Sequence, residues 1–233
     1  MSTDRYGGAQ VLVDLIALGV PTALGAVWIA RMVDHNQPRH RELTRVCGLL
    51  FFATLLYIPA VQAQIDTLSE DHFGLAHMHV LVGRCLVLLA AGEYLSLGGR
   101  LSSRPLLVSL GRPLAAAAVI TLLTVYAFAP MRSDPDGGDT VFNVVYGCMA
   151  AAASGTVFGV AAWARRQAIS PEVRRSLNAL VWASALGLVY GLLAAASANL
   201  ALVRFVAAGS LVALAFAGVR AVLRHQRLRR LGD

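Results

Sequence analysis

Apolar residues fill the chain in seven long stretches, separated by short polar segments rich in arginine and aspartate. A helix needs about 20 mostly apolar residues to cross the hydrocarbon core of a bilayer. We therefore expect an all-α, polytopic membrane protein, a bundle of seven transmembrane helices in which residues 1–233 form one domain. The predicted spans are Gln10–Met32, Leu43–Ile65, Leu75–Leu97, Leu106–Phe128, Val141–Ala164, Arg175–Ala195 and Leu200–Val222. Pro21 and Pro59 lie inside the first two spans, which predicts kinks there.

All 20 basic residues are arginine, and their distribution predicts the orientation of the spans. Four lie in 31–45, three in 100–112, four in 165–175 and five after residue 219, so sixteen fall on one side. The loops of the other side contain mainly acidic residues. Because arginine accumulates in short cytoplasmic loops, we expect the N-terminus outside and the C-terminus in the cytoplasm. This asymmetry accounts for the net charge of +7 without nucleic acid as a partner.

Two spans contain glycines at the spacing that allows close helix packing. The fifth span carries Gly155 and Gly159, and the sixth carries Gly187 and Gly191. Small residues four apart let helix backbones approach closely. They form either a dimer face or contacts within the bundle, and their position in consecutive helices favours the bundle.

Polar side chains within the spans lie mostly in the outer half, which predicts a cavity open toward the outer leaflet or outer water. The third span has the strongest signal, because His77 and Arg84 share one helix face and His79 lies nearly opposite. A helix that is polar on two faces belongs at the centre of a bundle. The candidate substrate-binding residues are Tyr57, His77, His79, Arg84, Tyr126, Asn143, Tyr146, Tyr190 and Arg204.

Two acids inside the spans, Asp14 and Glu93, are the candidate catalytic residues. A carboxyl group in an apolar site holds its proton and can act as a general acid. A structural role stays open for each, because Asp14 could pair with a buried arginine and Glu93 with an arginine of the inner loops. It also stays open that the histidines are interfacial residues and that Arg204 extends outward to water.

We expect neither a metal nor a cofactor. Only one span contains histidine, whereas bis-histidine haem in a bundle normally uses facing helices. The spacing of His72, His77 and His79 matches no strong zinc pattern. A retinal Schiff base is excluded because the chain has no lysine.

Two stretches, from Arg45 to Val61 and from Thr140 to Tyr190, resemble the seven-helix N-terminal region of an uncharacterised actinobacterial membrane family labelled putative transporters. Heavy use of alanine, leucine, valine, glycine and arginine is also typical of such bacteria. In size and helix number the chain is similar to small integral-membrane terpene cyclases of natural-product biosynthesis. The Trp-Glu pair of their fungal members is absent, since Leu56-Tyr57-Ile58-Pro59 stands in the second span.

These features favour a small enzyme of the bacterial cytoplasmic membrane that cyclises or isomerises a lipid-soluble, prenylated substrate. Asp14 is the preferred proton donor, Arg84 and His77 orient a polar head, and tyrosines line the path of the prenyl chain. A transporter of a small solute and a seven-helix sensor that signals through a partner remain alternatives. Either a monomer or an oligomer, embedded in membrane lipid, fits the pattern.

Overall fold

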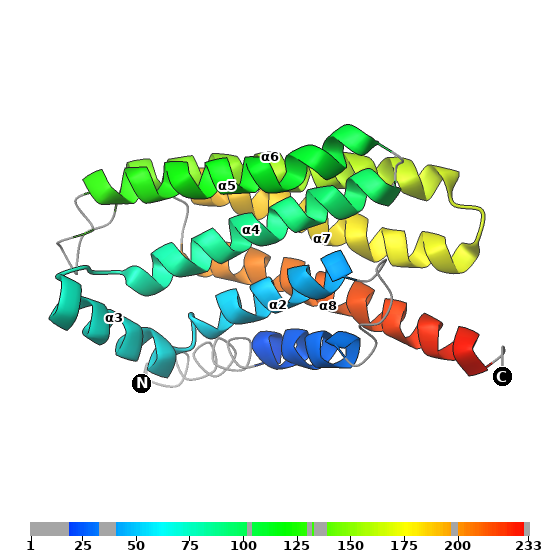
Figure 1. The fold of residues 1–233 in the computed structure, drawn as a ribbon, viewed down its shortest axis with the longest axis horizontal. Coiled ribbons are helices and arrows are strands. Elements are labelled where there is room, and N and C mark those ends of the chain that lie inside the picture. The colour runs from blue at the N-terminus through cyan, green and yellow to red at the C-terminus, as the bar shows by residue number, and fades with distance from the viewer. Residues whose placement is uncertain are drawn as a thin grey trace, which may run out of the picture.

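The computed structural model describes residues 19–32, 41–101, 104–129, 132, 139–196 and 200–230. Helices make up nearly all of these residues, and no strand occurs among them, so the expected all-helical class is confirmed. A helical segment at 19–32 is followed by α2 to α8 (Figure 1). The named helices are α2 (Arg41–Leu55), α3 (Pro59–Phe73), α4 (Met78–Leu101), α5 (Pro105–Phe128), α6 (Thr140–Gln167), α7 (Pro171–Ala195) and α8 (Leu200–Arg230).

Five of the described helices are long and apolar enough to cross a membrane. They cover Met78–Arg100, Pro105–Phe128, Thr140–Gln167, Val173–Ala195 and Leu202–Arg220, close to the last five predicted spans. The second predicted span is not one straight helix, because α2 and α3 meet at 78° and count as a sixth span only if taken together. Of the first predicted span, residues 10–18 lie outside the described residues, and residues 19–32 are helical.

The chain itself explains where several helices begin and end. Pro59, Pro105 and Pro171 occupy the first turns of α3, α5 and α7, where a missing N–H is not needed. The α6 helix is capped by Asp139, whose carboxylate accepts a hydrogen bond of 2.9 Å from the Phe142 N–H. At the other end of α3, Gly74 adopts a left-handed conformation with φ of 61°, which reverses the chain toward α4.

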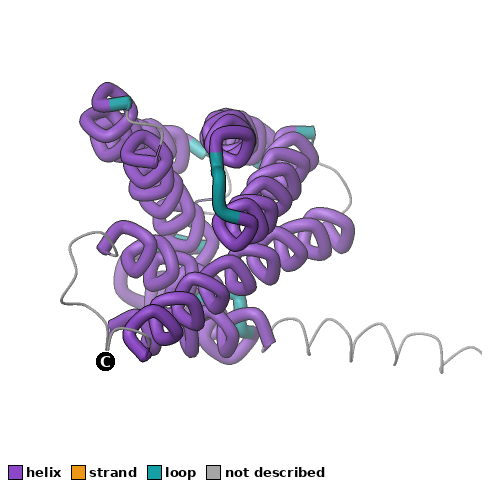
Figure 2. Tube along the Cα trace, turned by 90° about the vertical axis from the view of Figure 1, so that its right-hand side faces the viewer, coloured by secondary structure: helices purple, strands orange, loops and turns teal. Residues whose placement is uncertain are grey.

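The α4 helix lies at the centre of the bundle, as its polar residues predicted. It packs against α2, α3, α5 and α6. Figure 2 views the bundle from the side that lies on the right of Figure 1. Two apolar clusters fill the interior. One includes Leu122, Phe142 and Tyr146, and the other includes Leu24 and Val46.

The arginine-rich loops gather at one end of the bundle, on the right of Figure 1. The junction of α4 and α5, the loop between α6 and α7, and the C-terminal half of α8 all lie there. The opposite end contains α3, the start of α4 and the start of α6. We call the arginine-rich end the inner end and the opposite end the outer end, following the orientation that the arginine distribution predicts.

Candidate functional site

Arg84 is the centre of the polar contacts in the outer half of the bundle. It projects from the second turn of α4 toward α6, where its guanidinium carbon lies 4.6 Å from the ring centres of both Phe142 and Tyr146. Its Nη2 donates a hydrogen bond of 2.6 Å to the Asn143 side-chain oxygen. Aromatic faces and an amide oxygen therefore surround part of a cation that is half-buried in the bundle.

One nitrogen of this guanidinium has no partner. Nη1 of Arg84 is buried and forms no aligned hydrogen bond among the described residues, although the Tyr57 hydroxyl also interacts with this guanidinium. No carboxylate in the described part of the chain forms an ion pair with Arg84. A buried donor without a partner costs roughly 1–3 kcal/mol, and more when charged, so the site is suited to an incoming acidic or polar group.

Two tyrosines, Tyr57 and Tyr146, contact this guanidinium, and a third, Tyr190, contacts both of them. The hydroxyl groups of Tyr146 on α6 and Tyr190 on α7 are 3.1 Å apart, and their rings meet edge to face. Tyr57, at the break between α2 and α3, is in electrostatic contact with Arg84, Tyr190 and Arg204. We call Arg84 and its neighbours the arginine–tyrosine cluster, which consists of Tyr57, Arg84, Phe142, Asn143, Tyr146 and Tyr190.

A second pair of side chains lies beside the cluster. The Nδ1 atom of His79, on α4, lies 2.6 Å from Oδ2 of Asp66 on α3. The backbone N–H of His79 also donates to Oδ1 of Asp66, at 3.3 Å. Only 5% of the His79 side chain is exposed, against 20% for Asp66. The rings of His79 and Tyr57 are nearly perpendicular, at 6.1 Å between centroids, which joins this pair to the cluster.

The Asp66–His79 pair has the arrangement of an oriented acid–base group. At 2.6 Å the pair is a close charge contact, although Nδ1 of His79 makes no aligned hydrogen bond. A carboxylate beside one ring nitrogen favours a proton at that nitrogen and leaves Nε2 to exchange one. Asp66 is not among the candidate residues from the sequence, because its position there indicated a residue of the outer acidic loop. Only the 78° turn before α3 brings it to His79.

Two further candidates, His77 and Tyr126, lie beside the cluster, just before the start of α4 and near the end of α5. His77 is not on the helix face of Arg84, because α4 begins at Met78 and His77 precedes it with φ of +56°. Its Nε2 is buried without a partner among the described residues, and its ring lies 6.5 Å from that of His79. Tyr126 donates its hydroxyl hydrogen to the Ala76 carbonyl, so it fastens the end of α5 to the loop before α4.

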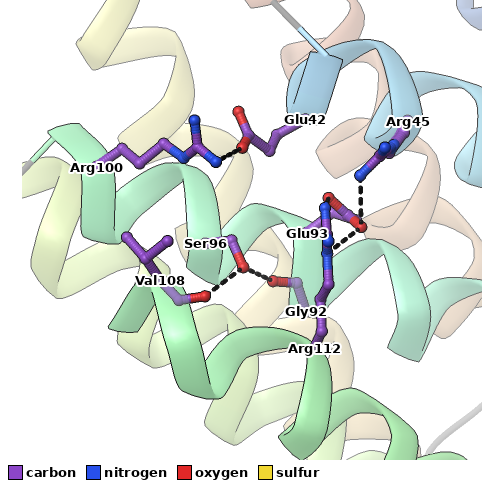
Figure 3. A network of polar contacts seen from close by, with 8 residues as sticks. All are labelled: Glu42, Arg45, Gly92, Glu93, Ser96, Arg100, Val108 and Arg112. Carbon is purple, nitrogen blue, oxygen red and sulfur yellow. Dashed lines mark hydrogen bonds and ion pairs between the residues drawn. The ribbon is translucent and has the colours of Figure 1, made fainter. Parts of the chain in front are cut away.

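Glu93 lies at the inner end, away from the cluster. Its carboxylate accepts hydrogen bonds from Nε and Nη2 of Arg112 on α5, at 2.9 and 3.3 Å, and lies 3.5 Å from Arg45 on α2 (Figure 3). Beside it, Arg100 pairs at 2.8 Å with Glu42, which is almost fully buried. Glu93 thus takes the ion-pair role that the sequence left open, with Arg112 and Arg45 as its arginines.

The remaining candidates are Asp14 and Arg204. Asp14 lies outside the described residues. Arg204 is exposed in the second turn of α8 and contacts Tyr57 only electrostatically. Among the described residues, no group of three or more histidines, cysteines and acids could hold a metal ion.

Comparison with known protein families, with curated proteins and with solved structures gives no match. The resemblances to a transporter family and to membrane terpene cyclases therefore stay expectations.

Proposed function

We propose that the chain is a small membrane enzyme that carries out acid–base chemistry on a lipid-soluble, prenylated molecule. The observation that carries this proposal is the unpaired, buried Nη1 of Arg84 beside the Asp66–His79 pair. An arginine that is desolvated without a carboxylate is suited to hold the polar head of a ligand. The exposed hydrophobic surface of the helices gives such a ligand a path from the bilayer.

The proposed reaction is a cyclisation or isomerisation, which needs a proton but consumes none. The Asp66–His79 pair supplies the proton to an alkene or epoxide and takes a proton back when the product forms. The rings of Tyr57, Tyr146 and Tyr190 present π-faces that stabilise a passing carbocation. Arg84 holds the polar head and stays outside this chemistry.

The change of Asp66 to Asn tests the proposal, because the amide keeps the shape of the carboxyl group but cannot relay a proton. We expect turnover of a prenylated substrate to fall by about 10²–10⁴-fold, the usual effect of losing a general acid or base. The measurement is product formation by purified protein in lipid nanodiscs, assayed by mass spectrometry with a panel of prenylated quinones, phenols and epoxides. His79→Gln should give a similar loss.

Asp71→Asn is the matched control, because Asp71 is exposed on the same helix. It should keep wild-type turnover. Equal losses in the two aspartate variants would contradict the assignment of Asp66. If wild-type protein converts no substrate of the panel yet moves a solute across liposomes, transport replaces catalysis.

Transport is the second candidate, and the bend between α2 and α3 is the observation that favours it. Discontinuous helices at membrane depth are common where transporters bind their substrates. Here the break places Tyr57 directly beside Arg84 and His79. The same residues would then bind a solute with an acidic group, and liposome flux rather than product formation would depend on Arg84.

A further inference from the structure

A hollow between α7 and α8 at the inner end is lined by arginines and aromatic residues that take no part in the outer site. Its volume is about 320 Å³, within the range of sites for small molecules. Two alanines form part of its wall, and its other lining residues are Arg175, Asn178, Trp182, Phe216 and Arg220. None of these residues belongs to the arginine–tyrosine cluster.

The hollow carries two positive charges. Neither Arg175 nor Arg220 forms an ion pair with a carboxylate among the side chains that the structure describes. The guanidinium of Arg220 lies 4.6 Å from the centre of the Phe216 ring, which holds it toward the hollow's rim. Arginine forks match phosphate oxygens in shape as well as in charge, so an anionic phosphate group complements this rim.

Below the arginines the wall is apolar and open to the surroundings. Trp182 is 67% exposed and Phe216 is 51% exposed, both within helices that are apolar enough to cross a membrane. Trp182 follows Arg175 by seven residues along α7, which places it roughly 10 Å deeper than that arginine. The arginines lie at the level of the lipid head groups, and the aromatic surface lies at the level of the acyl chains. A phospholipid would contact both parts, whereas a soluble anion would contact only the arginines.

We propose that this hollow binds an anionic phospholipid of the cytoplasmic leaflet. The phosphate and its head group bind Arg175 and Arg220, and one acyl chain lies along Trp182 and Phe216. The bound lipid bridges α7 and α8 at the end where both carry arginines. This site is separate from the outer site and does not depend on the reaction proposed there.

Competition between phosphatidylglycerol and phosphatidylcholine with identical acyl chains tests the proposal. Native mass spectrometry of the purified full chain should detect preferential retention of phosphatidylglycerol. Since each arginine near an anionic head group contributes about fivefold to binding, the double variant Arg175→Gln, Arg220→Gln should lower this preference by tenfold or more. Circular dichroism and the thermal transition report whether that variant is folded.

The double variant Arg165→Gln, Arg166→Gln is the matched control, because it removes two exposed arginines from the same end but outside the hollow. It should keep the preference. An equal loss in the control, or no loss in the first variant, would overturn the proposal. A further measurement leaves both arginines in place: with Trp28 and Trp163 changed to Phe, brominated phosphatidylglycerol should quench Trp182 more than brominated phosphatidylcholine does. Equal quenching by the two lipids would also overturn it.

Discussion

At the scale of single residues, Arg84 is the most informative side chain, because its replacement should change activity without much change in stability. Placing an arginine in the middle of a membrane helix costs about 2.5–3.5 kcal/mol on insertion scales. The contacts with Phe142, Tyr146 and Asn143 return part of this cost, since a cation–π contact and a charged hydrogen bond each contribute about 0.5–3 kcal/mol. The two terms are similar in size, so Arg84 adds little net stability.

We therefore expect the free energy of unfolding of Arg84→Met to lie within about 1 kcal/mol of the wild-type value, while the variant loses ligand binding or turnover. Thermal unfolding in detergent, followed by circular dichroism, measures the first effect. Arg84→Lys keeps the charge but lacks the planar guanidinium with its paired N–H donors, and it should keep only part of the activity. A loss of several kcal/mol in Arg84→Met would instead indicate that the arginine balances a carboxylate of the chain itself.

At the scale of the helices, apolar length could be predicted from sequence, whereas the contacts of the site could not. Windows of hydropathy locate α4 to α8 because a span must be apolar along its whole length. The Asp66–His79 pair depends on the direction in which α3 leaves the corner before Pro59. A proline indicates that a helix bends there, but it does not give the angle, which is 78° between α2 and α3. His77 was misplaced because a helical wheel assumes that the helix has already begun, whereas the left-handed His77 stands just before it.

The glycine spacing predicted that α6 and α7 pack closely, but it did not show which glycines lie at the contact. A Cβ atom added at Gly191 would lie 2.5 Å from the Ala151 nitrogen and 2.8 Å from the Gly147 carbonyl oxygen. Gly191 therefore allows backbone contact between α7 and α6, and its α6 partners are Gly147 and Ala151. A Cβ atom at Gly159 would meet nothing within 4 Å, so this member of the predicted motif has no packing role within the described bundle.

These two glycines form a matched pair for measuring the contact. Gly191→Ala should destabilise the protein by about 1–3 kcal/mol, because the new methyl group forces α6 and α7 apart. Gly159→Ala should be neutral or stabilise by up to about 1 kcal/mol, since alanine favours the helix. Unfolding in a mixed detergent series measures both changes. Equal stabilities of the two variants would contradict the close approach of α6 and α7, and a change of oligomeric state in Gly159→Ala would favour the dimer interpretation for that residue.

At the scale of the whole molecule, the two ends of the bundle differ in chemistry. Carboxylates at the inner end are held by arginines, as Glu93 is by Arg112 and Glu42 by Arg100, and these pairs tie α2, α4 and α5 together. At the outer end, Arg84, His77 and His79 each keep a buried nitrogen without a hydrogen-bond partner in the described chain, and at the inner end one oxygen of Glu42 does so too. The two ends differ in ion pairing: Glu93 and Glu42 pair with arginines, whereas Arg84 pairs with no described carboxylate, as is typical of a binding site. The proposed reaction at the outer end and the proposed lipid site at the inner end both depend on which end faces the cytoplasm.

Cysteine labelling in intact cells determines that orientation. In a chain whose three native cysteines, Cys47, Cys85 and Cys148, are changed to alanine, single cysteines are placed at Asp71, Gly137 and Ser170. Gly137 lies outside the described residues, whereas Asp71 is exposed on α3 and Ser170 lies in the loop before α7. The arginine distribution predicts that an impermeant maleimide labels the cysteines at positions 71 and 137 in intact cells and labels that at 170 only after lysis. The reverse pattern would place the Asp66–His79 pair at the cytoplasmic face and the lipid site in the outer leaflet, so its anionic lipid would have to come from that leaflet.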